Sequence, residues 1–189
     1  RLSLVGSEMC IRDRYEAAVD LVERHATELV LQGHIKTVEG WMQAIPPEWS
    51  ARSVRANMAF AWMYLVQEAT PWALSYVERL QAILETLPAG GALDPALEAE
   101  WLALQATVRN AQGRPDEGLA LATRALEVAP AADHTLRSRI YLALARAHRL
   151  RNDAPGVLTA FQRSVEHGRL ASNAVVESVS YTHLTLPTN

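Results

Sequence analysis

The chain has 189 residues, 49% of them hydrophobic, and a formal net charge of −3. This balance argues against the basic face typical of DNA-binding domains, and no apolar run approaches the length that spans a membrane. A single cysteine, Cys10, leaves no disulfide framework or thiolate metal site, which fits a reducing cytoplasm. Abundant Ala and Leu with few β-branched runs indicate an all-α protein.

The two ends of the chain interrupt the helical pattern of the residues between them. Residues 3–14 (SLVGSEMCIRDR) and 179–189 (VSYTHLTLPTN) resemble translated sequencing-adapter DNA, and natural disordered termini are the alternative. We therefore set residues 1–14 and 179–189 aside as segments foreign to the fold. Because the chain also begins at Arg1 rather than Met, we expect a fragment whose helical repeat domain is residues 15–178.

Four helices are predicted in the first half of the chain, from apolar residues at helical spacing and from residues that start or stop a helix. The first ends at Gly33, and the proline pair at 46–47 ends the second. Ser50 is predicted to cap the third helix and Thr70 the fourth. The expected ranges are about 15–32, 35–45, 54–65 and 70–88.

The clearest helix pair lies on either side of Gly113, which ends its first helix. Asp94 and Pro95 begin that helix, with Glu98 placed to complete a capping box. Small residues expected to let the two helices approach closely are Ala106, Gly118 and Ala125. Further helices are expected over about 134–151 and 155–170, with another beginning within 172–178.

The helices form four pairs, whose internal turns are predicted near Gly33, Glu68, Gly113 and Asn152, about 35 to 45 residues apart. A period in that range is typical of a helical solenoid, in which each repeat contacts only its neighbours. The third pair resembles the tetratricopeptide repeat (TPR), with small residues, a turn glycine and the closing Pro130 at the motif's positions. Gln105 and Arg109 depart from that motif. The expected fold is an all-α solenoid of TPR-like antiparallel helix pairs in a right-handed superhelix.

Residues 23–69 carry a more specific pattern. A helix ending in LVLQG is followed by one that closes with GWMQAIP and by one that contains FAWMYL. This order resembles the sensor region of MalT-like, LuxR-family transcriptional activators. The resemblance implies that an ATP-binding module precedes such repeats in the full-length protein and that a DNA-binding helix-turn-helix domain follows. This segment has no G-x-x-x-x-G-K-[ST] phosphate loop and no basic recognition helix, so both functions belong to absent parts.

For this segment the resemblance implies a cytoplasmic, non-catalytic sensor without a cofactor. It would bind a small-molecule effector or a regulatory protein and control self-association, with no membrane contact. The alternative is a stand-alone TPR-like scaffold for a peptide or protein partner. A third hypothesis, an enzyme, finds no catalytic constellation, since the histidines lack the one-turn pairing of helical metal ligands. Outside the set-aside tail they are His25, His34, His134, His148 and His167.

The first helix of each pair is expected to line the inner curve of the solenoid. Aligning the pairs on Ala26, Ala61, Ala106 and Ala145 places Asp20, Glu23 and Glu100 there, beside the candidate binding residues. These candidates are Arg55, Trp62, Thr107, Asn110, Arg139, Arg146 and Arg149.

The arginines of the fourth pair, Arg139, Arg146 and Arg149, follow helical spacing and could together bind a carboxylate or phosphate. The alternative is that they form a solvated, salt-bridged face. Trp62 is either a stacking platform or ordinary packing. Trp41, Trp72 and Trp101 are assigned to packing. His167, near a helix C-terminus, is expected simply to favour the helix dipole.

Overall fold

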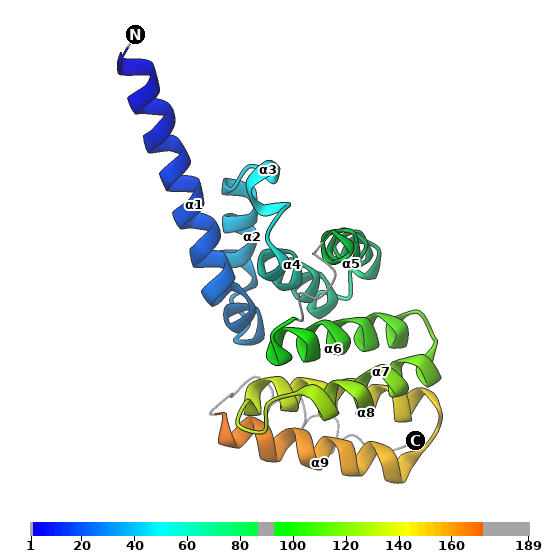
Figure 1. Ribbon diagram of the computed structural model, residues 1–189. Helices are drawn as coiled ribbons and strands as arrows, with labels where there is room; N and C mark the ends of the chain where they lie inside the picture. The colour runs from blue at the N-terminus through cyan, green and yellow to red at the C-terminus, as the bar shows by residue number, and fades with distance from the viewer. Residues whose placement is uncertain (1, 87–92, 172–189) are drawn as a thin grey trace. The chain divides into compact units, whose positions relative to one another are not determined.

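The structure is a computed structural model that describes residues 2–86 and 93–171, with side chains from residue 13 onward (Figure 1). The chain divides into two compact units, residues 1–88 (unit 1) and residues 89–189 (unit 2). Every regular element in the described ranges is a helix, and the helices pack as adjacent pairs. The predicted all-α, TPR-like solenoid class is therefore confirmed. The helix expected within 172–178 and the tail 179–189 lie outside the described residues.

Unit 1 is built around its fourth helix, which contacts three of its neighbours. That helix is buried on nearly every side, because its sequence, VRANMAFAWMYLV, is apolar almost throughout. The elements of the unit are α1 (Leu2–Leu31), α2 (Ile35–Ala44), α3 (Pro47–Ser50), α4 (Val54–Val66) and α5 (Thr70–Glu85). Helix α4 contacts α1, α2 and α5, as the first helix of a second repeat contacts the pair before it.

Unit 2 repeats this arrangement with helices of more even length. Its elements are α6 (Pro95–Ala111), α7 (Pro115–Val128), α8 (His134–Leu150) and α9 (Ala154–Leu170). Helix α8 contacts its own partner α9 and both helices of the preceding pair, α6 and α7. Each helix keeps a polar side, and the core between them consists largely of Ala and Leu.

The first helix begins earlier than the sequence analysis predicted. Helix α1 starts at Leu2 rather than near residue 15, so it begins inside the segment that the sequence analysis set aside. The segment contains no proline, and its only strong helix-disfavouring residue is Gly6, which costs about 1 kcal/mol in a helix interior. Nothing in its sequence therefore stops the helix, while its resemblance to adapter sequence stays a prediction.

Two of the predicted helix caps are also wrong. Ser53, rather than Ser50, caps α4, and its hydroxyl accepts a hydrogen bond from the Ala56 N–H at 2.9 Å. Ser50 instead ends α3, a single turn that begins at the second proline of the 46–47 pair. Thr70 is already the first residue of α5, whose cap position is taken by Ala69. The predicted Asp94 cap of α6 is confirmed, since its carboxylate accepts from the Leu97 N–H.

The four predicted turns share one backbone geometry. Gly33, Glu68, Gly113 and Asn152 are the described residues with positive φ, at 83°, 57°, 74° and 58°. In each turn this residue donates its N–H to the carbonyl three residues back, and the next residue donates five residues back. This is the Schellman motif, which ends a helix and satisfies its last carbonyls. The repeat inferred from the sequence is thus present in the backbone of both units.

Candidate interaction surface

The predicted surface residues of unit 2 come from α6 and α8, which contact each other. Arg139 of α8 donates through Nη1 to the Glu100 Oε1 atom of α6 at 2.9 Å. The side chains are only 9% and 13% exposed. Removing one partner of a buried ion pair strongly destabilises the folded protein. Arg139 therefore has a structural role, which is to join two repeats. Arg139 is thus salt-bridged, but at a buried contact between helices rather than on a solvated face.

Asn110 is a second predicted surface residue that the structure places between helices. It is 2% exposed, and its side-chain amide donates to the Ala143 carbonyl of α8 at 2.9 Å. A Cβ atom at Gly118 of α7 would lie 2.1 Å from the Asn110 Oδ1 atom. Asn110 therefore fills the junction of α6, α7 and α8 and has no surface left for a ligand. The close approach predicted at Gly118 is confirmed.

Three predicted residues of unit 2 remain accessible. Thr107 and Arg146 are partly exposed, and Arg149 is exposed. The Thr107 hydroxyl donates to the Ala103 carbonyl of its own helix. Within residues 13–86 and 93–171, neither Arg146 nor Arg149 has an ion-pair partner, whereas Arg109, Arg114, Arg124, Arg151 and Arg163 all do. The two guanidinium groups are thus the available charges of the α8 surface.

The two candidates in unit 1, Arg55 and Trp62, differ in their exposure to solvent. Arg55 is exposed on the first turn of α4. Trp62 is 5% exposed, which favours the packing alternative over a stacking platform, because α1, α2 and α5 surround α4. Trp72, assigned to packing, is instead 64% exposed, and only one face of its ring stacks on Tyr64.

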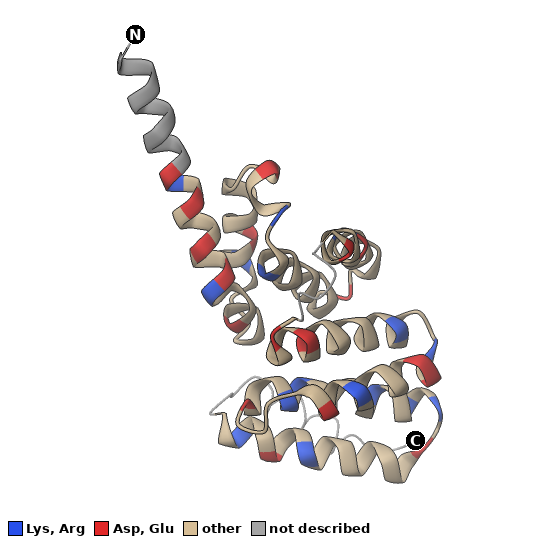
Figure 2. Cartoon of the chain, viewed as in Figure 1, with Lys and Arg blue, Asp and Glu red and all other residues tan. Residues whose placement is uncertain are grey.

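Unit 1 also holds an open pocket of about 300 Å³ beside α1. Asp20 and Glu23, both predicted to face the inner curve, help to line it together with Trp49. Figure 2 shows the acidic residues of the described part of α1 in red. Asp20 already pairs with Arg24, and Glu23 accepts a hydrogen bond from the Ser53 hydroxyl at 2.6 Å. Because both carboxylates have partners, we assign this pocket no ligand.

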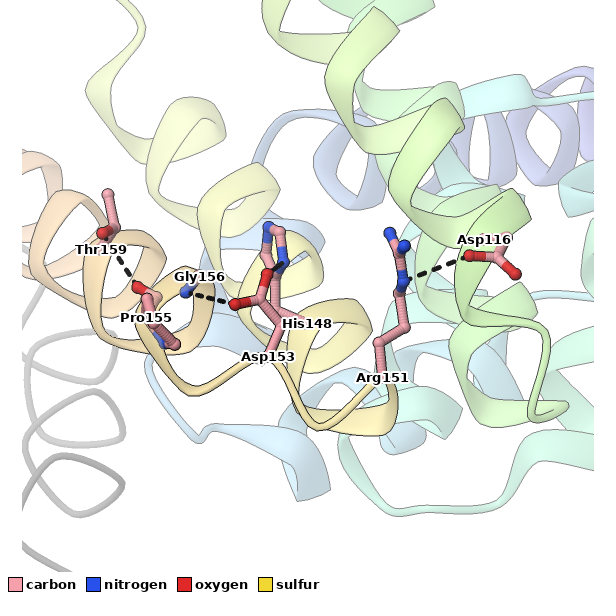
Figure 3. Close-up of polar contacts among 7 residues, drawn as sticks. All are labelled: Asp116, His148, Arg151, Asp153, Pro155, Gly156 and Thr159. Carbon is pink, nitrogen blue, oxygen red and sulfur yellow. Dashed lines mark hydrogen bonds and ion pairs between the residues drawn. The ribbon is translucent and has the colours of Figure 1, made fainter.

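The turn between α8 and α9 is held by the side chain of Asp153 (Figure 3). One carboxylate oxygen accepts from the Gly156 N–H at 3.0 Å, and the other meets His148 Nδ1 at 2.8 Å. The Gly156 N–H, followed by the His148 hydrogen bond, holds the pKa of Asp153 below its usual value despite partial desolvation. Arg151 links the same turn to Asp116 of α7 at 3.2 Å. The network orders a helix start and leaves no reactive group.

Two histidines that sequence reasoning left scattered meet in unit 2. His134 begins α8 and His167 lies in the last turn of α9, with their Nδ1 atoms 3.0 Å apart. The pKa of His167 is lowered, mainly by burial and then by Arg137 and His134. A helix dipole alone would favour the charged ring, so burial outweighs the effect expected from its position. Spacing could not reveal this pair, because it depends on how α9 packs against α8.

Two further features were sought among the described residues, a cluster of metal ligands and a membrane-spanning helix. Within residues 13–86 and 93–171, no three His, Cys, Asp or Glu side chains converge as metal ligands require. None of the described helices combines the length and apolarity needed to cross a bilayer. These findings concern only the described parts of the chain.

Comparison with known protein families identifies a repeat in unit 2. A tetratricopeptide-repeat family model matches residues 97–169. The matched range lies inside unit 2 and covers less than half of the chain, so it shows a TPR-type repeat in α6–α9. No curated protein matches the chain, and neither does any solved structure. The resemblance of residues 23–69 to MalT-like regulators finds no support in these comparisons.

Proposed function

We propose that the chain is a protein-interaction scaffold whose unit 2 binds an acidic segment of a partner protein. The observation that carries this proposal is that Arg146 and Arg149, on the first helix of the second pair of unit 2, have no ion-pair partner among the residues that the structure describes. TPR-type repeats generally serve protein–protein interaction and are not typically catalytic. Unpaired guanidinium groups favour carboxylates, which they bind through charge-assisted hydrogen bonds.

The neighbouring side chains support a peptide rather than a small ion. Leu142 lies four residues before Arg146 on α8 and is partly exposed, so an apolar side chain can contact the same stripe. When Ala106 is aligned with Ala145, Thr107 on the adjacent α6 holds the position equivalent to Arg146. A surface with two cations, one aliphatic and one hydroxyl side chain is suited to an extended acidic segment.

Peptide titration tests the proposal. We expect a fluorescent peptide rich in glutamate to bind more tightly than the same peptide with glutamine, and the R146Q/R149Q variant to lose about tenfold or more in affinity. The matched control is R163Q, because Arg163 is exposed but already paired with Glu166 at 2.9 Å. Equal binding of the two peptides, or unchanged affinity in R146Q/R149Q, would overturn the proposal.

The regulator interpretation is a more specific form of the same function. It adds an effector, control of self-association, an ATP-binding module before the repeats and DNA binding after them. Its support is the sequence pattern of residues 23–69 alone. Sequencing the flanking gene tests it, since a regulator requires a nucleotide-binding module upstream and a helix-turn-helix downstream.

A further inference from the structure

The contact between His134 and His167 joins the first turn of α8 to the last turn of α9. Their Nδ1 atoms are 3.0 Å apart and their ring centroids 5.2 Å apart, so the two nitrogens face each other along the line between the rings. A hydrogen bond in this arrangement needs one protonated and one unprotonated nitrogen. Neutral rings satisfy it, and so does a single imidazolium beside a neutral ring. Two imidazolium rings do not.

Packing prevents the rings from turning away freely. His167 stacks on Tyr141 with centroids 5.5 Å apart and an interplanar angle of 18°. One turn further along α8, the Ser138 hydroxyl donates to the Ser164 carbonyl of α9 at 2.7 Å, and the Ser164 hydroxyl can donate to the Ser138 carbonyl at 3.1 Å. These buried hydrogen bonds fix the register of α8 against α9 and so keep the two histidines opposed.

The surrounding charges also oppose protonation. Arg137 on α8 and Arg163 on α9 both act to lower the pKa of His167, and Glu166 is the one neighbour that raises it. Glu166 is paired with Arg163, which limits its help. From the α7 side, Arg137 meets the carbonyls of Leu126 and Ala129, which hold its positive charge close to the pair.

We propose that the His134–His167 contact is an acid-sensitive latch, which holds the start of α8 to the end of α9 and opens when both rings are protonated. Opening separates one end of this helix pair while the Ser138–Ser164 hydrogen bonds keep the rest packed. The latch would regulate the shape of unit 2 in response to mild acidification. It is independent of the peptide-binding proposal, because it involves neither Arg146 nor Arg149.

The sign of the pH dependence follows from the direction of the shift. The pKa of His167 is lower in the folded protein than its ordinary value of 6.5, so the unfolded chain binds more protons as the pH falls. The latch therefore contributes its full stability above about pH 6.5. That contribution is lost as the pH falls through the lower, folded-state pKa.

The test compares two pH values in tag-free protein. Between pH 7.5 and pH 5.5 we expect the wild-type Tm to fall by about 4 °C more than that of H167Q, which keeps a hydrogen-bonding side chain without a titrating ring. Hydrogen exchange, corrected for the intrinsic exchange rate at each pH, should show lower protection at the start of α8 and the end of α9 in the wild type at pH 5.5 than at pH 7.5. The matched control is H25Q, which removes an exposed histidine of α1 and should keep the wild-type pH response.

Nuclear magnetic resonance of the unaltered protein gives a second readout. We expect the His167 ring to titrate below pH 6.5 and its pKa to rise in H134Q, since one opposing positive charge is then removed. Equal loss of Tm in wild type and H167Q, or a His167 titration that H134Q does not move, would overturn the latch.

Discussion

Helices α4 and α5 of unit 1 pack through aromatic rings, whereas helices α6 and α7 of unit 2 approach closely through small residues. Between α4 and α5, Tyr76 packs against Phe60 and Tyr64, with ring centroids 5.7 Å apart in both contacts. Between α6 and α7, Gly118 lies so close to Asn110 that a methyl group would not fit. Aromatic contacts tolerate several spacings, but close approach requires small residues at fixed positions. The range that the TPR model matches, residues 97–169, includes this close contact.

The two units also differ in their contacts between successive pairs. Unit 2 buries an ion pair, Glu100–Arg139, between α6 and α8. In unit 1 the Ser53–Glu23 hydrogen bond joins the start of α4 to α1, and it has a neutral donor at a partly buried site. A buried charge depends on its partner far more than a hydroxyl does. Unit 2 should therefore be the unit whose stability depends most on a single contact.

Breaking this ion pair gives the largest expected effect. R139A leaves the Glu100 carboxylate buried without its partner, which costs about 3–5 kcal/mol. Urea unfolding measures the loss, and hydrogen exchange should place it in α6–α9 while α1–α5 keep their protection. The control is R163A, which removes an exposed pair and should cost about 0–1 kcal/mol. Equal losses in the two variants would show that the Glu100–Arg139 pair is not a structural contact.

Filling the close contact in unit 2 gives the next largest effect. In G118A the new methyl group meets the Asn110 side chain and lies 3.1 Å from the Ala106 carbonyl, so either Asn110 or the spacing of α6 and α7 must change. Overpacking of this kind costs about 1–3 kcal/mol. The control is G40A in α2, where a Cβ meets nothing within 4 Å and helix propensity should give a gain of about 1 kcal/mol. Thermal unfolding compares them, and a gain in both would contradict the close packing.

The sequence predicted the elements better than the contacts between them. Gly33 and Gly113 indicated the positions of their turns, because glycine adopts positive φ without strain. Helical spacing predicted the other two turns. The fate of the arginines could not be predicted in this way. Glu100 and Arg139 are 39 residues apart, and His134 and His167 are 33 apart. Whether such residues meet depends on helix register, which side-chain packing sets rather than local sequence.

The predicted start of α1 was wrong for a different reason. The sequence analysis excluded residues 1–14 because of their resemblance to adapter sequence, and such a resemblance carries no information about backbone conformation. The segment lacks a proline, so the helix that contains Val22 and Ala26 extends back to Leu2. The prediction of the surface residues had a similar limit, since an alignment of repeats assigns each residue to a side of the helix but does not predict how deeply it is buried. The burial of Trp62 and Asn110 could therefore not be predicted from the alignment.

The four turns give the smallest and most symmetrical comparison, because each unit has one glycine turn and one turn with a side chain. Glu68 in unit 1 and Asn152 in unit 2 both have φ near 58°, at 57° and 58°. Left-handed backbone costs about 1–2 kcal/mol for ordinary residues, and asparagine tolerates it better than glutamate. We therefore expect E68G to raise the free energy of unfolding by about 1 kcal/mol, after the entropy of glycine in the unfolded chain is subtracted. N152G should raise it less, so equal gains in thermal unfolding would show that both turns are equally strained.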